Sequence, residues 1–190
     1  MSRPRSEDKR QAILAAATQL FAEAGLNAST ARIARTAGVA EGTLFTYFPS
    51  KDDLLNQLYL ELKGELRGMM LPAYPAQAGA REQIHHAWRI YVQWGSTHPG
   101  KRRVLAQLGL CERLSEAARA AEAEAFCDLN ALLGESVRQG LLRDQPTAFV
   151  AAIMGALAET TMDFIARDPA QAEHTSEAGF AAFWNAISRT

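Results

Sequence analysis

The chain has 190 residues, of which 48% are hydrophobic and 22% are charged, values close to those of average globular proteins. This composition excludes a disordered chain, a collagen-like chain and a small disulfide-rich protein. The formal net charge of −1 excludes a basic coat over the whole molecule, yet the segment up to Lys51 holds seven basic residues against four acidic ones, a local charge of +3. The sequence therefore predicts an ordinary globular protein with its positive charge gathered near the N-terminus.

Cysteine spacing and hydropathy indicate the compartment. Cys111 and Cys127 form no CxxC motif, which argues against a disulfide framework or a zinc site and favours a reducing environment. The longest uncharged run, 145–158, is too short to cross a bilayer. Acidic residues near the start interrupt the basic segment that a secretory signal needs. We expect a cytoplasmic protein that does not span a membrane.

Helical periodicity runs through the chain and the prolines fall mostly between the helical stretches, as expected from the disruption that proline causes inside helices. Nine helices are predicted, over residues 7–24, 30–37, 41–47, 51–71, 80–96, 101–113, 115–139, 146–166 and 170–188. Ser6 is the expected N-cap of the first helix, and Gly25 is the expected end of it. No stretch shows the sustained period-two alternation of a strand, so the predicted fold class is all-α.

Two short helices joined by Ala37-Gly38-Val39 predict a helix-turn-helix, because Gly38 can adopt the positive φ that such a turn requires. The apolar set expected to face the first helix is Ile33, Ala34, Ala37, Val39, Leu44 and Phe48. The side chains left free to reach DNA are Arg32, Arg35, Glu41, Gly42, Thr43, Phe45, Thr46 and Tyr47. The alternative is a plain helical hairpin within a bundle.

Residues 8–55 resemble the TetR (tetracycline repressor) family of bacterial transcription regulators. The motifs that carry the resemblance are Ile13-Leu14-x-x-Ala17, Leu20-Phe21-x-x-x-Gly25, Ser29-Thr30-x-x-Ile33-Ala34-x-x-Ala37-Gly38-Val39, Gly42-Thr43-Leu44-Phe45-x-Tyr47-Phe48 and Lys51-x-x-Leu54-Leu55. The resemblance implies a homodimer with its recognition helix at 41–47. It also implies a DNA-binding domain over 1–50, followed by a ligand-binding and dimerisation domain over 51–190 that starts with a long fourth helix.

The same resemblance assigns roles at the DNA. Thr30, Tyr47 and Lys51 are expected to contact phosphates, which fixes the register on the duplex without reading its sequence. The residues expected nearest the base edges are Glu41, Gly42, Thr43, Phe45 and Thr46. Many family members carry Tyr where this chain has Phe45, so a hydroxyl contact to phosphate is missing there. The Arg3-Pro4-Arg5 tail either adds minor-groove or phosphate contacts or is a solvated chain end.

The last two predicted helices are candidates for a subunit interface. The helix over 146–166 is apolar on nearly all sides, which suits one face in the core and one against a partner. In a monomer the last helix would expose an apolar patch made of Ala178, Phe180, Ala181, Phe183, Trp184 and Ile187. The predicted interface residues are Ala151, Gly155, Ala158, Ala181, Trp184 and Asn185. The family resemblance implies a four-helix bundle of these two helices from each subunit.

A ligand cavity is expected among the middle helices, although such apolar stripes are often ordinary core. The candidate lining residues are Trp88, Tyr91, Cys111, Phe126, Asn130, Met154, Leu157, Thr161 and Phe164. The expected inducer is a small, largely apolar molecule of unknown identity. Three histidines, His85, His86 and His98, lie close in sequence but belong to no i, i+4 set of ligands, so neither a metal nor another cofactor is expected.

These patterns predict a ligand-responsive, homodimeric DNA-binding transcription regulator, a repressor that a small molecule releases from a pseudo-palindromic operator of double-stranded DNA. An enzyme is not expected, because nucleophile elbows, phosphate-binding glycine loops and paired carboxylates with workable spacing are absent from the sequence. The alternatives are a helical protein that binds partners without an inducer, and an enzyme.

Overall fold

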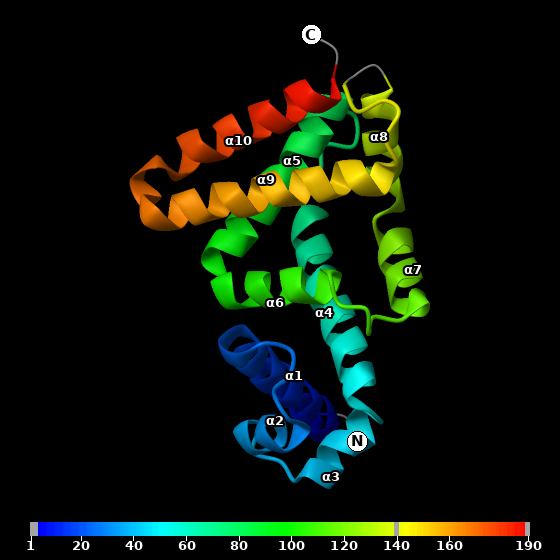
Figure 1. Ribbon diagram of the computed structural model, residues 1–190, viewed down its shortest axis with the longest axis vertical. Coiled ribbons are helices and arrows are strands. Elements are labelled where there is room, and N and C mark those ends of the chain that lie inside the picture. Colours follow the sequence, from blue (N-terminus) through cyan, green and yellow to red (C-terminus); the bar gives the residue numbers. More distant parts are fainter. Residues whose placement is uncertain (1–3, 139–140, 189–190) are drawn as a thin grey trace. The chain divides into compact units, whose positions relative to one another are not determined.

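A computed structural model describes residues 4–138 and 141–188 (Figure 1). Within these residues it contains ten α-helices, one 3-10 helix and no strand, which confirms the all-α prediction. The helices are α1 (Pro4–Ala24), α2 (Thr30–Thr36), α3 (Glu41–Tyr47), α4 (Lys51–Met70), α5 (Ala80–Thr97), α6 (Pro99–Gly109), α7 (Glu116–Ala125), α8 (Cys127–Val137), α9 (Thr147–Arg167), η1 (Pro169–Gln171) and α10 (Ala172–Ile187).

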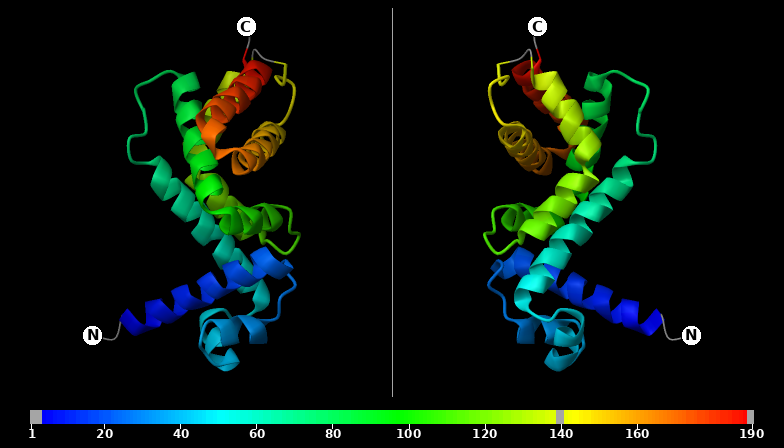
Figure 2. Two further views of the ribbon diagram at one scale, coloured as in Figure 1. Left: turned by 90° about the vertical axis from the view of Figure 1, so that its left-hand side faces the viewer. Right: turned by 90° about the vertical axis from the view of Figure 1, so that its right-hand side faces the viewer.

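The chain forms two compact units. Unit 1 consists of Met1–Gly64 and His98–Glu122, and unit 2 consists of Glu65–Thr97 and Ala123–Thr190. The four N-terminal helices can be followed in Figure 2, where α4 is one continuous helix that starts in unit 1 and ends in unit 2. The two units are defined by packing within the chain, so they do not test the predicted boundary at residue 50. The division into a DNA-binding domain and a ligand-binding domain stays a prediction.

The core of unit 1 supports the two short helices. Helix α1 places its apolar residues on one face at the predicted three- and four-residue spacing. The buried apolar residues of this part of unit 1 are Ile13, Leu14, Ala17, Leu20 and Phe21 of α1, Ile33 and Ala34 of α2, Leu44 of α3, Phe48, and Leu54, Leu55 and Leu58 of α4. Burial of this apolar surface, at roughly 25 cal/mol per Å², is the main force that holds α2 on α1 and α3 on α2.

The limits of α1 test two sequence predictions. The helix begins at Pro4, where proline is well tolerated in a first turn, so Ser6 lies inside the helix and its prediction as N-cap was wrong. The prediction for Gly25 is confirmed: its φ is +77° and its N–H donates to the Phe21 carbonyl at 2.9 Å.

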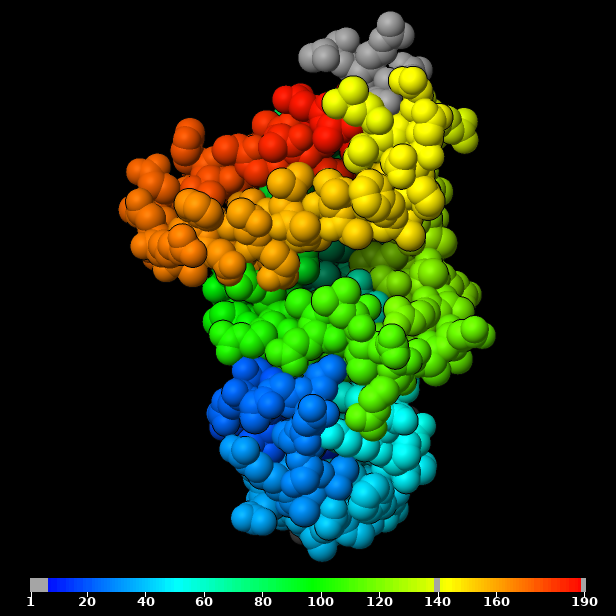
Figure 3. Space-filling view, in the orientation of Figure 1, coloured from blue at the N-terminus to red at the C-terminus, as the bar shows by residue number. Residues whose placement is uncertain are grey.

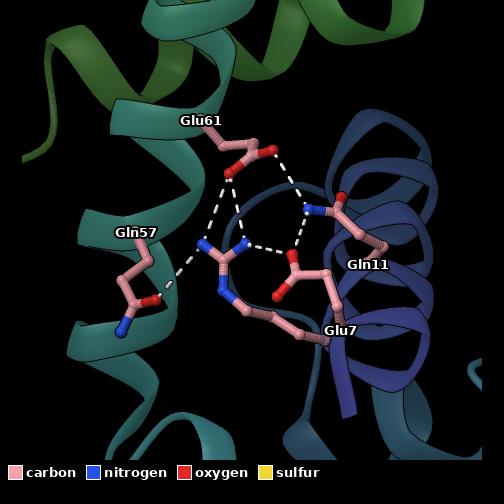
Figure 4. A network of polar contacts seen from close by, with 5 residues as sticks. Glu7, Gln11, Gln57 and Glu61 are labelled. Atoms are coloured by element: carbon pink, nitrogen blue, oxygen red, sulfur yellow. Dashed lines mark hydrogen bonds and ion pairs between the residues drawn. The ribbon is translucent and has the colours of Figure 1, made fainter. Parts of the chain in front are cut away.

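Polar contacts join α1 to α4 within unit 1 (Figure 4). The Arg10 guanidinium lies 3.3 Å from both Glu7 and Glu61 and donates to Gln57 at 3.5 Å. The Gln11 amide donates to the same two carboxylates, at 3.0 and 3.2 Å. The bond from Gln11 lowers the pKa of Glu7; desolvation opposes this shift, and the Arg10 charge adds to it. The network adds polar contacts to the apolar packing of α1 on α4.

The predicted single helix over 115–139 is in fact two helices, so this prediction was wrong. Helix α7 ends at Ala125 and α8 begins at Cys127, with Phe126 between them at φ −113° and ψ 17°. Arg67 Nε donates to the Ala125 carbonyl at 2.8 Å, which satisfies an acceptor that the end of α7 leaves open. The break contains neither proline nor glycine, so no local sequence signal marks it.

Unit 2 has an aromatic core. The fully buried Trp88 of α5 lies parallel to Phe183 of α10, with ring centroids 6.4 Å apart, and its indole N–H donates to the Ser176 carbonyl at 3.0 Å. Phe180 and Ile187 are buried in the same cluster. The predicted exposed patch on the last helix was therefore wrong for Phe180, Phe183 and Ile187, because α5 and α9 of the same chain cover that side of α10.

Helix α9 leaves an apolar face uncovered. It is the one helix of the described chain that is long and apolar enough to cross a membrane by length and composition, with a mean hydropathy of 1.5. It packs on α5 and α10 within unit 2. Phe149 and Phe164 are nevertheless 46% and 55% exposed, and Figure 3 shows α9, in yellow and orange, open along the face seen there.

Candidate nucleic-acid interface

The turn between α2 and α3 has the hydrogen bonds of a Schellman motif. Gly38, at φ +70°, donates to the Arg35 carbonyl at 3.1 Å, and Val39 donates to the Ala34 carbonyl at 3.0 Å. Ser29 caps the other end of α2, where its hydroxyl accepts from Arg32 N at 3.3 Å. These local bonds set the angle at which α3 leaves the turn.

Helix α3 has one buried side and one open side. Leu44 is fully buried and anchors the helix, with Phe48 buried just beyond its end. The predicted base-contacting residues Glu41, Gly42, Phe45 and Thr46 are exposed, and Thr43 and Tyr47 are half-buried. Phe45 is 41% exposed, a large apolar group left in water by its own chain.

Gly42 shows that the open side is also unobstructed. A β-carbon added at Gly42 would meet no atom within 4 Å, so packing within the chain does not require glycine there. Glycine in a helix costs about 0.5–1 kcal/mol relative to alanine. A small residue at this position lets another molecule approach the backbone of α3 closely.

Some of the predicted DNA contacts are already paired with each other. The Thr30 hydroxyl donates to the Glu41 carboxylate at 2.7 Å and so links the first residues of α2 and α3. Arg32 lies 3.8 Å from Glu23, with both side chains about half exposed. Arg35 is exposed and has no ion pair among the described residues.

Lys51 starts α4 beside this surface. Ser50 caps the helix by accepting from Asp53 N at 3.0 Å, and the Lys51 ammonium lies 6.0 Å from the centre of the Phe21 ring. Burial, followed by the charge of Arg113, lowers the pKa of Lys51, while Asp52 opposes the shift. The Lys51 side chain is thus half-buried at the first turn of α4, beside Phe21.

Arg113 is a residue near this surface that the sequence did not indicate. It follows α6 and forms an ion pair with Asp52. Two residues on, Ser115 donates from both its backbone N–H and its hydroxyl to Asn56 Oδ1, at 2.8 and 3.0 Å. The segment after α6 thus holds the first two turns of α4, and a separation of about sixty residues hid it from any local pattern.

The Arg3-Pro4-Arg5 tail is only partly described. Arg3 lies outside the described residues, and Pro4 and Arg5 form the start of α1. The prediction of DNA contacts from this tail therefore stays a prediction.

The predicted ligand residues lie in several environments. Trp88 and Thr161 are buried and hydrogen-bonded to other groups of unit 2, to Ser176 and to the Leu157 carbonyl respectively. The half-buried ones are Tyr91, Phe126, Asn130, Met154 and Leu157. Phe164 is exposed on α9, and Cys111 belongs to unit 1, so the nine residues do not line one cavity of unit 2.

One cavity of unit 2 does include a predicted ligand residue. Its volume is about 120 Å³, and Phe126 lines it together with Met70, Tyr74 and Leu129. Arg67 and Asp128 provide its charges. Burial, and then the Asp128 charge, raises the pKa of Tyr74.

The residues predicted for the subunit interface also differ in their exposure. Ala151, Ala181 and Asn185 are exposed, Gly155 and Trp184 are half-buried, and Ala158 is fully buried by its own chain.

Comparison with known proteins identifies the N-terminal segment. Residues 13–58 match the sequence model of the bacterial regulatory proteins of the tetR family. The uncharacterised HTH-type transcriptional regulator YhgD of Bacillus subtilis (strain 168) is 30% identical over 94 residues, 49% of each chain, so the match spans about half the length of that relative. The nucleoid occlusion factor SlmA of Pasteurella multocida (strain Pm70) is 25% identical over 96% of this chain and 94% of its own.

A solved structure extends the likeness to the fold of the whole chain. A protein from Shewanella sp. PV-4, described as a tetR family transcription regulator, superposes with a TM-score of 0.83 at 28% identity, covering 96% of this chain and 99% of that one. The match over residues 13–58 and this superposition confirm the resemblance seen in the sequence: the helix-turn-helix segment matches the tetR family of bacterial regulatory proteins, and the fold of the whole chain is similar to that of a solved tetR family regulator.

Proposed function

We propose that the protein is a cytoplasmic, homodimeric transcription regulator that binds a pseudo-palindromic DNA operator through α3 and releases it when a small molecule binds unit 2. The observation that carries the proposal is the open side of α3. Glu41, Gly42, Phe45 and Thr46 are exposed on a helix that Leu44 fixes to a rigid core. Nothing in the described chain uses these four residues for packing, whereas a helix entering a major groove needs them.

Charge around α3 suits a phosphate backbone. Arg35 is an exposed cation without an ion pair in the described chain, and Arg32 has only a long contact at 3.8 Å. Lys51 stands at the first turn of α4, where exposed backbone N–H groups also favour anions. These groups would supply the part of the affinity that does not depend on sequence and that falls with salt. Glu41 would repel phosphates but can accept a bond from a cytosine amino group.

Dimerisation would cover the open face of α9. Phe149 and Phe164 stand at its two ends, and small residues such as Ala152 and Ala156 are exposed between them. Two copies of such a face can pack against each other about a two-fold axis. The dimer would then present two α3 helices to half-sites roughly 34–36 Å apart, or somewhat more.

A ligand would act through the cavity near the end of α4. Met70, in the last turn of α4, lines this cavity, and Lys51 is the first residue of the same helix. The helix rises about 1.5 Å per residue, so it joins the two sites over roughly 30 Å. A ligand that binds one position of α4 better than another would thereby change DNA affinity. The apolar wall of Met70, Phe126 and Leu129 favours a small, largely apolar molecule.

The volume of this cavity, about 120 Å³, is small for a ligand site. It therefore also favours a second candidate function, a DNA-binding protein that is regulated by a protein partner instead of a small molecule. A thermal-shift screen of small apolar compounds separates the two. Under our proposal a compound that stabilises the protein also lowers its DNA affinity, and Phe126→Ala weakens both effects. A stabilising compound that leaves DNA affinity unchanged would contradict the ligand step while leaving DNA binding intact.

DNA binding is tested by selecting duplexes from a random library and measuring affinity by fluorescence anisotropy. Thr46→Ala should change which bases are preferred. The matched control is Thr97→Ala, because both hydroxyls are exposed and donate to the carbonyl four residues earlier, at 3.1 and 2.8 Å. If no sequence is enriched, or if Thr97→Ala changes the preference as much as Thr46→Ala does, α3 is not the reading element.

The interface is tested by light scattering. Phe164→Glu should convert dimers to monomers, because it would bury an unpaired charge in the contact. Leu141→Glu is the control, since Leu141 is also exposed, at 83%, but lies outside α9. An unchanged dimer for Phe164→Glu would remove α9 from the interface.

A further inference from the structure

A second and larger pocket of unit 2, about 520 Å³ in volume, lies between α5 and the start of α10. It differs from the cavity near Met70 in both place and chemistry. Its walls carry Arg89, Gln93 and Ser96 from α5 and Glu173 from α10, with Val92 and Ile165 as apolar lining.

Two contacts fix how α5 and α10 face each other. His85 Nε2 lies 2.8 Å from the Glu177 carboxylate, and the Trp88 indole N–H donates to the Ser176 carbonyl at 3.0 Å. Residue numbers rise along α5 as they fall along α10, so the helices run in opposite directions at this contact. Side chains one turn further on each helix share the same face. The next facing pair after His85 and Glu177 is therefore Arg89 and Glu173.

Arg89 and Glu173 do not pair with each other. No ion pair joins Arg89 to Glu173 in the described part of the chain, and both side chains are exposed around the pocket. The pocket occupies the space where the His85–Glu177 contact would otherwise be repeated. A guanidinium and a carboxylate thus face one space from opposite walls, each with its bonding capacity free.

Ser96 adds an independent sign of a missing partner. Its hydroxyl oxygen is buried and forms no hydrogen bond within the described structure. Buried hydroxyl groups in folded proteins nearly always have a partner, so an unpaired one beside a cavity points to a polar occupant. Gln93 stands one turn before it near the same wall, with an exposed amide.

We propose that this pocket binds a small zwitterion of the α-amino acid class with a short apolar side chain. Arg89 bonds the carboxylate in the two-pronged geometry that guanidinium groups favour. Glu173 accepts from the ammonium group, and Ser96 and Gln93 satisfy the remaining polar atoms. Val92 and Ile165 contact the apolar side chain. The pocket volume lies within the range of 300–1,000 Å³ that is typical of small-molecule sites. This site does not depend on DNA binding.

Isothermal titration calorimetry of the full chain with L-leucine tests the proposal. Two matched probes remove one charge each: 4-methylpentanoate has no ammonium group, and 3-methylbutylamine has no carboxylate. We expect saturable binding of L-leucine, with each one-ended probe weaker by about tenfold or more, as expected for the loss of a charge-assisted bond. Equal binding of all three probes, or no saturation with L-leucine up to about 10 mM, would overturn the zwitterion site.

Variants place the binding in this pocket. Arg89→Gln and Glu173→Gln should each weaken L-leucine by about tenfold, and Ser96→Ala by about threefold. The controls Arg138→Gln and Glu124→Gln remove exposed charges of unit 2 outside the pocket and should leave the titration unchanged. Circular dichroism melting confirms that each variant folds. If L-leucine does not bind and Arg89 and Glu173 instead show coupled losses of stability in a double-mutant cycle, the two side chains simply pair with each other and the proposal is wrong.

Discussion

The helix-turn-helix and unit 2 differ in how their side chains divide between core and surface. In the helix-turn-helix, each short helix has one buried side and one exposed side, and the exposed side of α3 adds nothing to the core beyond the bond from Thr30 to Glu41. In unit 2, α9 and α10 are apolar on several sides, and the side that lies in the core is decided by which neighbours cover it. Phe183 is buried and Phe164 is exposed, although both are phenylalanines on helices of similar composition. The exposed side of a helix can be predicted from a local motif. For a helix that is apolar all round, the exposed side is decided only by how the rest of the chain packs against it.

The largest contrast should appear in stability. Leu44 is fully buried under α3, whereas Met154 on α9 is half-buried. Leu44→Ala should lower the free energy of unfolding by about 2–5 kcal/mol, because it leaves a cavity in a closed core, and Met154→Ala should cost roughly half of that or less. Urea denaturation followed by circular dichroism gives both values. Equal losses would show that unit 2 is packed as tightly around Met154 as unit 1 is around Leu44.

Tyr59, a buried tyrosine of unit 1, should make the stability of the protein depend on alkaline pH. Burial, aided by the Glu122 charge and opposed by Arg119, raises the pKa of Tyr59 in unit 1 to about 12. The folded state then holds this proton more tightly than the unfolded state, so the associated stability is present below pH 10 and is lost as the pH rises toward 12. The loss should reach at most about 2 kcal/mol. Denaturation at several alkaline pH values should give a flatter profile for Tyr59→Phe, and an unchanged profile would contradict this account.

Gly42→Ala separates stability from function. Nothing lies near a β-carbon at Gly42, so alanine should stabilise the fold by up to about 0.5–1 kcal/mol. It should weaken DNA binding, because the methyl group stands on the side of α3 that we propose enters the groove. Gly68→Ala is the matched control: it is an exposed helical glycine with the same open space, and it should leave DNA affinity alone. If both variants bind DNA equally well, close approach to α3 is not needed.

The smallest effect concerns the contacts between α1 and α4. Glu61→Gln removes the charge that Arg10 meets at 3.3 Å, in a pair that is partly exposed. We expect a loss of about 0.5 kcal/mol that shrinks as salt screens the pair. Melting temperatures at low and high salt measure it, with Glu124→Gln as an exposed control. A loss independent of salt would mean that Glu61 acts through packing or hydrogen bonds and not through charge.

Sequence patterns predicted the elements whose signals are local. Gly25 and Gly38 act within a few residues of their own positions, and the structure places them at the helix end and the turn that were expected. The exposed side of α3 followed from the same spacing. For these features, conformational preference and nearest neighbours are enough.

The remaining features depend on contacts between distant parts of the chain. Arg113 reaches Asp52, and Arg67 bonds the carbonyl at which α7 ends, across about sixty residues in each case. No local pattern contains such pairs. The burial of Phe180 and the open Arg89–Glu173 pair likewise depend on how α10 lies against α5. Sequence reasoning therefore located the helix with an open, exposed side but not the pockets of unit 2.

The central claim, that the open side of the helix-turn-helix binds DNA, is tested most directly by the salt dependence of affinity for one selected duplex. Anisotropy titrations at several salt concentrations compare the natural chain with Lys51→Ala and with Arg138→Ala, an exposed cation of unit 2. The account predicts that Lys51→Ala weakens binding on all sequences and reduces the slope of log affinity against log salt by about one. It also predicts that Arg138→Ala matches the natural chain. Binding without salt dependence, or an equal change for both variants, would contradict it.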